Sequence, residues 1–130
     1  MALCVNPQTQ TVAVPVGASR VYLKLRAYDT REYAEFLTRV TGLRREEEQA
    51  DPSWEARAGF IDRLLVGISA RDAQGREETL EFADPESGEV RPLNPEVKDW
   101  TSFVPPSWKI AASFLIEGRA ARFEEDTLKN

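Results

Sequence analysis

Apolar and polar residues alternate along the N-terminal part of the chain. Valines occupy every second position over 12–16, and after Gly17 apolar residues again alternate with polar ones over 21–27. A period of two is typical of strands with one buried face, and a short glycine-containing turn between two such runs indicates a β-hairpin. Pro15 cannot donate a ladder hydrogen bond, which predicts that the first strand lies at the edge of its sheet.

A helical pattern follows the hairpin. Asp29 is a suitable capping residue, and Glu32 stands three residues later, at the second position of a capping box. Apolar residues then recur at helical spacing over 33–40, and Gly42 is a natural C-terminal stop. We therefore expect a first helix that begins after Asp29 and ends at Gly42.

A second helix is predicted from Asp51-Pro52, a capping side chain followed by proline at the first helical position. An apolar stripe with spacings of three and four runs from Trp54 to Ile68, which places Trp54 in the core. We expect this helix to end near Val66 or Gly67.

Two different sequence patterns follow the second helix: a turn with a short strand, and then a proline-rich segment. A turn is expected at 72–75 and a short strand at 80–82, where apolar and polar residues alternate. Prolines then recur through 83–106, at a density that forbids a long helix or a central strand. Because Trp100 and Phe103 also lie in this segment, we expect a long loop that packs against the body, with one helical turn in 95–100.

A third helix is expected after Ser107, a capping residue, and residues 1–10 and 124–130 are expected to be flexible ends. The predicted fold class is α+β, in a single domain of residues 1–130. It contains an N-terminal β-hairpin, three main helices, a short second hairpin or strand and the long proline-rich loop. The apolar face of the third helix is predicted to consist of Ile110, Ala111, Phe114 and Leu115, with Lys109, Glu117 and Arg119 outside.

Composition and charge narrow the classes of function. The 130 residues are 42% hydrophobic and carry a formal charge of −5, which makes nucleic acid an unlikely partner. The chain has no histidine, so it lacks the usual general base and the commonest transition-metal ligand. Its single cysteine, Cys4, can form neither an internal disulfide nor a thiolate zinc site. We therefore expect no enzymatic activity, no metal and no cofactor.

The sequence shows neither the pattern of a secretory signal peptide nor that of a membrane-spanning helix. No basic region followed by an apolar core opens the chain. No apolar run approaches the roughly 20 residues that span a bilayer. We expect a protein that stays inside the cell that makes it and has no membrane partner.

Six residues are candidates for partner binding. On the second strand, basic and aromatic residues share one face. This pattern binds single-stranded nucleic acid by charge and stacking, or forms the solvent side of an amphipathic strand. Elsewhere, large aromatic residues of a kind enriched at protein interfaces stand in or just after the proline-rich segment. The candidates are Tyr22, Lys24, Arg26, Trp100, Phe103 and Trp108.

The order of these elements resembles that of a known family. A strand leads into the helix over 33–40, and a second helix ends in DRLLVG at 62–67. A turn and a short strand follow, then VPPSWK at 104–109, a final helix and a charged end. In this order, residues 20–130 resemble the small tail assembly chaperones and related tail-accessory proteins of long-tailed, siphovirus-type bacteriophages.

The resemblance implies a non-enzymatic protein that binds tail-tube or tape-measure subunits in the host cytoplasm before they polymerise. Its contact surfaces would be the hairpin edge and the 83–106 loop, because open strand edges and aromatic-bearing loops are ready interaction elements. The long proline-rich segment departs from the compact helical members. It leaves open a structural virion protein of the tail, head-completion or decoration type. A small nucleic-acid-binding module is a third alternative, and self-association is open in each case.

Overall fold

The computed structural model describes residues 5, 7–42 and 53–129, with side chains described as far as residue 118 except at Gly42. The chain forms two compact units. The first consists of Met1–Ala27 and Leu65–Pro105 and holds the strands; the second consists of Tyr28–Leu64 and Pro106–Asn130 and holds the helices. The fold is α+β, as predicted, with an N-terminal hairpin, three α-helices and a second short antiparallel hairpin.

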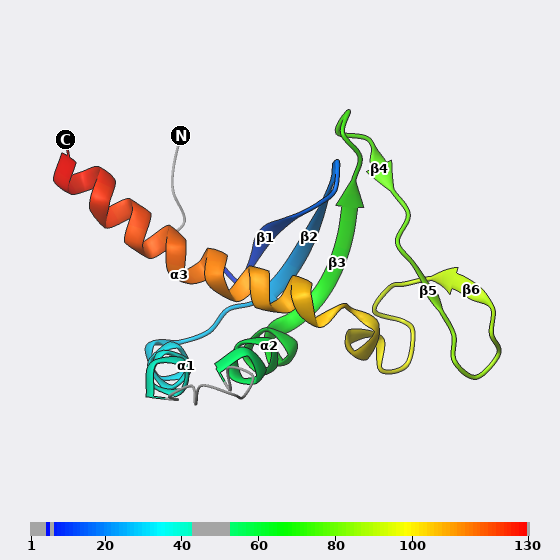
Figure 1. The fold of residues 1–130 in the computed structure, drawn as a ribbon, viewed down its shortest axis with the longest axis horizontal. Coiled ribbons are helices and arrows are strands. Elements are labelled where there is room, and N and C mark those ends of the chain that lie inside the picture. Colours follow the sequence, from blue (N-terminus) through cyan, green and yellow to red (C-terminus); the bar gives the residue numbers. More distant parts are fainter. Residues whose placement is uncertain (1–4, 6, 43–52, 130) are drawn as a thin grey trace, which may run out of the picture. The chain divides into compact units, whose positions relative to one another are not determined.

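The first unit is built on a four-stranded antiparallel sheet (Figure 1). The predicted hairpin is confirmed, and its turn has a positive φ of 60° at Gly17 but not at Ala18, the signs of a type II′ turn. The predicted edge position of the first strand is also confirmed, since the strand order is β1-β2-β3-β4. The strands are β1 (Thr9–Val16), β2 (Ser19–Arg26), β3 (Leu65–Arg71) and β4 (Glu77–Glu78).

One face of this sheet is buried. Five of the alternating apolar residues of the two hairpin strands are at most 2% exposed, as their period of two predicts, whereas Val16 beside the turn is half-buried. Ala70 of β3, which lies opposite Val21, continues this face and is equally buried. The buried residues of the hairpin are Val12, Val14, Val21, Leu23 and Leu25.

The strand β3 corrects the predicted end of the second helix. The helix α2 (Ser53–Leu64) ends two to three residues earlier than expected, and β3 begins at the next residue. Leu65 and Ile68 are three residues apart, a spacing that suits a helix, but they pair with Leu25 and Leu23 of β2. The free edge of β2 supplies backbone partners for this segment, and tertiary pairing overrides the local helical pattern.

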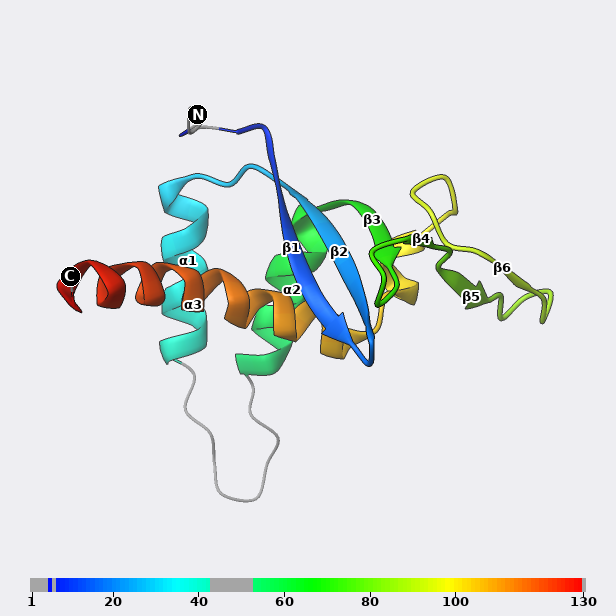
Figure 2. The same cartoon turned by 90° about the horizontal axis from the view of Figure 1, so that it is seen from above.

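The second unit contains the three α-helices. The helix α1 (Thr30–Gly42) begins with the predicted capping box: the Glu32 N–H donates to Asp29 Oδ1 at 2.8 Å, and the Asp29 N–H donates to Glu32 Oε1 at 3.4 Å. The ring of Phe36 stacks on that of Phe60 in α2, with centroids 4.2 Å apart. Figure 2 shows α1 and α2 side by side, and the Phe36–Phe60 pair is part of their contact.

The prediction that Trp54 lies in the core is wrong. Trp54 is 49% exposed, whereas Phe60, Ile61 and Leu64 of the predicted stripe are buried as expected, and Arg57 is buried beside them. The predicted helix start at Asp51-Pro52 lies outside the described residues.

The predicted apolar face of the third helix, α3 (Pro106–Lys129), is rotated as well. Phe114 is 48% exposed, whereas Lys109 is only 8% exposed. The Lys109 ammonium lies 2.8 Å from Asp62 Oδ1, so the aliphatic stem is buried while the charge is paired. Ala112, Ser113 and Ile116 complete the buried face of α3.

The ends of the chain are partly structured. Thr9 and Gln10 belong to β1, and α3 is helical through Lys129, so regular structure enters both segments that were expected to be flexible. In the part of the chain that the structure describes, no helix is both long and apolar enough to cross a membrane.

The proline-rich segment contains more regular structure than a loop. The second hairpin joins β5 (Glu81–Ala83) to β6 (Val90–Pro92), with Gly88 at a φ of 75° in the connection. A 3-10 helix, η1 (Trp100–Phe103), begins at the residue where the predicted helical turn was to end. The prolines still limit every element in this segment to a few residues, as their missing N–H groups require.

Candidate partner-binding surface

The face of the four-stranded sheet opposite its buried residues is the main candidate surface, and we call it the outward face. Strand register places residues of β1, β2 and β3 on it in adjacent rows. Lys24 lies between Thr11 and Gly67, and Tyr22 lies between Ala13 and Ser69. The outward face comprises Thr9, Thr11, Ala13, Pro15, Arg20, Tyr22, Lys24, Arg26, Gly67, Ser69 and Arg71.

The outward face concentrates positive charge in a chain whose net charge is −5. Arg20, Lys24 and Arg71 are exposed, and Arg20 lies directly opposite Arg71 in the register of β2 and β3. Like charges in direct opposition repel across a sheet. Glu77 of β4, opposite Arg71, is the carboxylate that this register brings to the same side of the sheet.

In the middle of the outward face, Gly67 has no side chain and leaves room for the neighbouring side chain of Lys24. A Cβ at Gly67 would lie 3.3 Å from the Lys24 Cβ and 3.4 Å from its Cδ. The methylene stem of Lys24 therefore lies over the backbone of β3, and the small residue at 67 makes room for it. Lys24 is itself an exposed residue, and it adds a positive charge to this face.

The open edge of β1 borders the outward face. The Ala27 N–H donates to the Gln8 carbonyl at 2.9 Å, which fixes the phase of the β1–β2 ladder. In an antiparallel pair the backbone groups of alternate residues point to opposite sides. Thr9, Thr11 and Ala13 therefore direct both N–H and C=O away from β2, and Pro15 directs only a C=O there. Among the described residues, no strand pairs with this side of β1.

The structure brings together only part of the predicted set of binding residues. Tyr22, Lys24 and Arg26 lie on the outward face, where Arg26 is half-buried and its Nη1 donates to the Ala27 carbonyl at 2.9 Å. Trp100 and Phe103 lie in η1 of the same unit, and Trp108 lies on α3 of the other unit.

The ring of Phe103 is a packing element. It stacks on Phe82 of β5 with centroids 4.5 Å apart, and the Arg91 guanidinium lies 5.4 Å from the Phe82 ring centroid. Arg91 also pairs with Asp84 at 3.3 Å. The backbone N–H of Glu86, helped by the nearby Arg91 charge, lowers the pKa of Asp84 from its usual value. These contacts hold the β5–β6 hairpin to η1.

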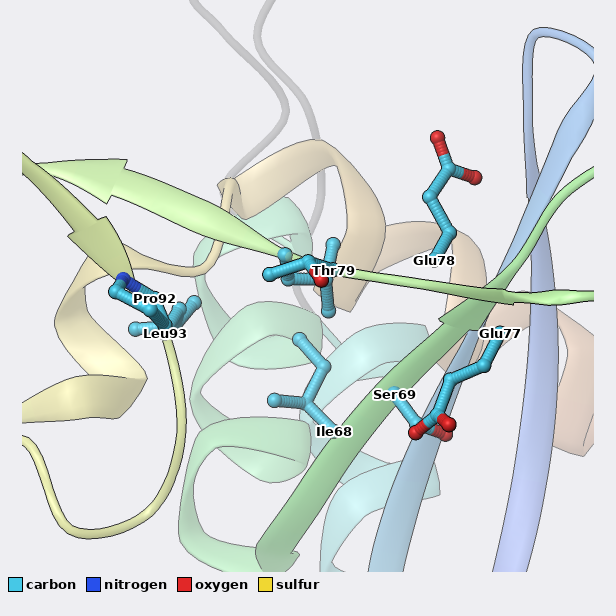
Figure 3. Close-up of a pocket in the computed structure, with 8 residues that line it drawn as sticks. Ile68, Ser69, Glu77, Glu78, Thr79, Pro92 and Leu93 are labelled. Atoms are coloured by element: carbon cyan, nitrogen blue, oxygen red, sulfur yellow. The ribbon is translucent and has the colours of Figure 1, made fainter.

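A pocket of about 310 Å³ lies beside β3 and β4, at the edge of the sheet opposite to β1. Figure 3 shows apolar Ile68, Pro92 and Leu93 on one side of it and two glutamates, Glu77 and Glu78, on the other. Glu78 accepts a hydrogen bond from the Ser19 hydroxyl at 2.6 Å, which gives it a structural role. The described residues contain no group of three or more acidic, histidine or cysteine side chains placed to hold a metal ion.

Sequence reasoning missed the contributions of β1 and β3 to the outward face. Arg71 and Gly67 reach it only through the register of β3 against β2, and part of β3 had been assigned to a helix. The alternation of the first strand already indicated that Thr11 and Ala13 share one side, but not that their backbone groups face an open edge.

Comparisons with models of protein families, with curated proteins and with solved structures found no match for this chain.

Proposed function

We propose that this protein is a non-enzymatic assembly protein that binds other proteins, and that its partners are tail-tube or tape-measure subunits of a long-tailed bacteriophage. The observation that supports binding best is the open edge of β1, eight residues long and bordered by the outward face. The phage partner rests on the resemblance in element order between residues 20 and 130.

An open strand edge binds by accepting a further strand from a partner. Main-chain hydrogen bonds supply affinity, and alternate side chains supply specificity. The edge of β1 offers both donors and acceptors at Thr9, Thr11 and Ala13 and loses its donor at Pro15. A partner strand is therefore expected to pair along 9–13 and to end at Pro15, which also limits uncontrolled edge-to-edge association.

The first test is co-expression with the products of the reading frames beside the gene, followed by size-exclusion chromatography. We expect a tail-tube or tape-measure product to co-elute with the protein and to be less soluble without it. If that product is equally soluble alone and elutes separately, the chaperone proposal fails.

A matched pair of variants tests the edge itself. The Thr11 N–H points away from β2, so Thr11→Pro removes an outward donor and leaves the β1–β2 ladder intact, as Pro15 already does nearby. Thr11→Val changes the side chain but keeps the N–H. We expect Thr11→Pro to weaken co-elution and Thr11→Val to preserve it.

The structural alternative is distinguished by peptide mass spectrometry of purified particles. A chaperone is absent from mature particles, whereas a tail, head-completion or decoration protein is present in stoichiometric amount. The basic outward face with Tyr22 favours nucleic acid as a second candidate. Filter binding that shows no salt-dependent affinity for single-stranded DNA or RNA rejects that candidate.

A further inference from the structure

We propose that the partner segment that pairs with β1 is acidic, with carboxylate side chains at the alternate positions that lie on the outward face. This inference rests on the proposed function, because it specifies the chemistry of the segment that the open edge of β1 accepts.

The first reason is the placement of charge. Arg20, Lys24 and Arg26 occupy successive outward positions of β2, and Arg71 adds a further cation from β3. A strand added beside β1 lies about 4.8 Å from β1 and roughly 9.6 Å from β2. That second distance is close to the Debye length of about 10 Å at moderate ionic strength, so the β2 cations act on the added strand, whereas Arg71, one strand further away, lies beyond it.

The second reason is the nature of the β1 side chains, which lie between the added strand and the cations of β2. The outward side chains of β1 are small and uncharged: Thr9, Thr11, Ala13 and Pro15. They neither neutralise the cations of β2 nor block a long side chain that leans across them. A glutamate on the added strand and a lysine or arginine on β2 are long enough to meet above this row.

Lys24 is the cation best placed to respond. It lies opposite Thr11, in the middle of the pairing stretch, whereas Arg20 lies opposite Pro15 at its end. The Lys24 stem now rests over Gly67, on the side of β3. A change of rotamer carries its ammonium toward β1, and exposed side chains change rotamer within nanoseconds.

The third reason is specificity. The whole chain carries a net charge of −5, so an acidic segment is repelled by the overall charge of the protein and attracted by the outward face. Backbone hydrogen bonds alone would allow a strand of any sequence to pair with β1. Attraction between opposite charges selects acidic strands among these. An acidic strand thus gains both orientation and discrimination at this edge.

The test uses the full chain and fluorescent peptides. The probe is a short acetylated peptide in which glutamate alternates with valine, and its partner probe has lysine in place of glutamate. We expect the glutamate peptide to bind at least roughly tenfold more tightly than the lysine peptide at low salt, with the difference shrinking as salt is added. Equal affinities for the two peptides overturn the inference.

The protein variants separate charge from backbone pairing. Lys24→Gln is expected to weaken binding of the glutamate peptide by about two- to fivefold, the usual size of one exposed charge pair. The double variant Arg20→Glu/Lys24→Glu is expected to abolish the preference for the glutamate peptide. Arg63→Glu/Lys98→Glu changes the net charge equally at two exposed residues that are not part of the outward face, and it should bind as the wild type does.

The edge is tested with Thr11→Pro and, in case that variant is destabilised, with wild-type protein and a glutamate peptide carrying N-methyl groups on alternate amides. Both changes should weaken binding by about three- to tenfold, the value of one or two hydrogen bonds. If neither change matters and a single-stranded oligonucleotide displaces the peptide, the outward face binds polyanions directly and the inference is overturned. Wild-type protein that is a dimer, and becomes a monomer in Thr11→Pro, overturns it in favour of a second copy at β1.

Failure of this inference is distinguishable from failure of the proposed function. If the co-expressed phage subunit elutes with Arg20→Glu/Lys24→Glu as well as with the wild type, the assembly function stands and the acidic segment is rejected. If no subunit elutes with either protein, the assembly function itself is rejected.

Discussion

The guanidinium of Arg57 and the carboxylate of Glu117 form a two-point ion pair inside the helical unit. Arg57 Nη1 lies 2.7 Å from Glu117 Oε2, and Nη2 lies 3.3 Å from Oε1. Nη1 also donates to the Ser113 hydroxyl at 3.3 Å, and the guanidinium carbon lies 3.8 Å from the centroid of the Phe114 ring. The Nε of Arg57 is buried without a hydrogen-bond partner. This pair joins α2 to α3.

We expect removal of one partner of this pair to be costly. Arg57→Ala leaves the Glu117 carboxylate, whose side chain is only 24% exposed, without its counter-charge. The free energy of unfolding should fall by about 3 kcal/mol. Urea denaturation followed by circular dichroism measures it. Arg31→Ala is the control: the Arg31–Glu35 side chains are 88% and 67% exposed, so its effect should stay within about 0.5 kcal/mol.

The double variant Arg57→Met/Glu117→Met removes both charges and tests whether the ion pair itself stabilises the helical unit. Apolar side chains of similar length avoid the cost of burying two charges and the unpaired Nε. We expect it to unfold at a higher urea concentration than Arg57→Ala. A double variant that is less stable than Arg57→Ala would contradict this expectation, and one that is less stable than the wild type would show that the pair is net stabilising.

The capping box of α1 predicts a difference between two substitutions at one residue. Asp29→Ala removes the acceptor for the Glu32 N–H and should lower the free energy of unfolding by about 1 kcal/mol. Asp29→Asn keeps an oxygen in the same place and should lower the free energy of unfolding by only about a few tenths of a kcal/mol. Thermal unfolding of both variants checks this, and equal losses would contradict a capping role.

Two glycines should respond to alanine with opposite sign. Gly75 has a φ of 81° in the turn closed by Asp72, so Gly75→Ala should lower the free energy of unfolding by about 1 kcal/mol through backbone strain. Gly59 lies within α2, and a Cβ there meets no atom within 4 Å. Gly59→Ala should raise the free energy of unfolding by up to about 1 kcal/mol. Parallel urea titrations compare them, and changes of the same sign would refute the comparison.

Alkaline pH should weaken the fold through Tyr33. Burial raises the pKa of the Tyr33 phenol above its ordinary value, and electrostatic interactions with Tyr28 and Glu117 raise it further. The folded state thus favours the neutral phenol. The resulting stability is present below the ordinary pKa and is lost as pH rises through the raised one.

Tyr33→Phe isolates this effect. The variant lacks the titrating phenol, so its loss of stability between neutral and strongly alkaline pH should be smaller than that of the wild type. Urea midpoints across this range measure the difference, and identical pH profiles for the two proteins would exclude Tyr33 as the source.

The hairpin and the first helix could be predicted from the sequence because their signals are local. Gly17 and Pro15 define the turn and the edge, and the Asp29–Glu32 spacing defines the helix start. The third strand could not be predicted in the same way, because the spacing of Leu65 and Ile68 fits a helix as well as the strand that pairs with β2.

The buried face of α3 and the burial of Arg57 in α2 were not predicted, because they depend on charge pairs between helices. Lys109 is buried through its contact with Asp62, and Arg57 through Glu117. Sequence patterns place such residues outside. The outward face could be predicted only along β2, where Tyr22, Lys24 and Arg26 alternate within one strand; the share of Arg71 required the register of β3.

The division of the first unit into two stretches of chain affects how the nascent protein folds. β1 and β2 leave the ribosome well before β3, which begins at Leu65. Until then the hairpin is a two-stranded ribbon with both edges open, a form that is marginally stable and prone to pair with other chains. Arg20 and Lys24 give that ribbon a net positive charge, so nascent hairpins on neighbouring ribosomes repel one another until β3 covers the edge of β2.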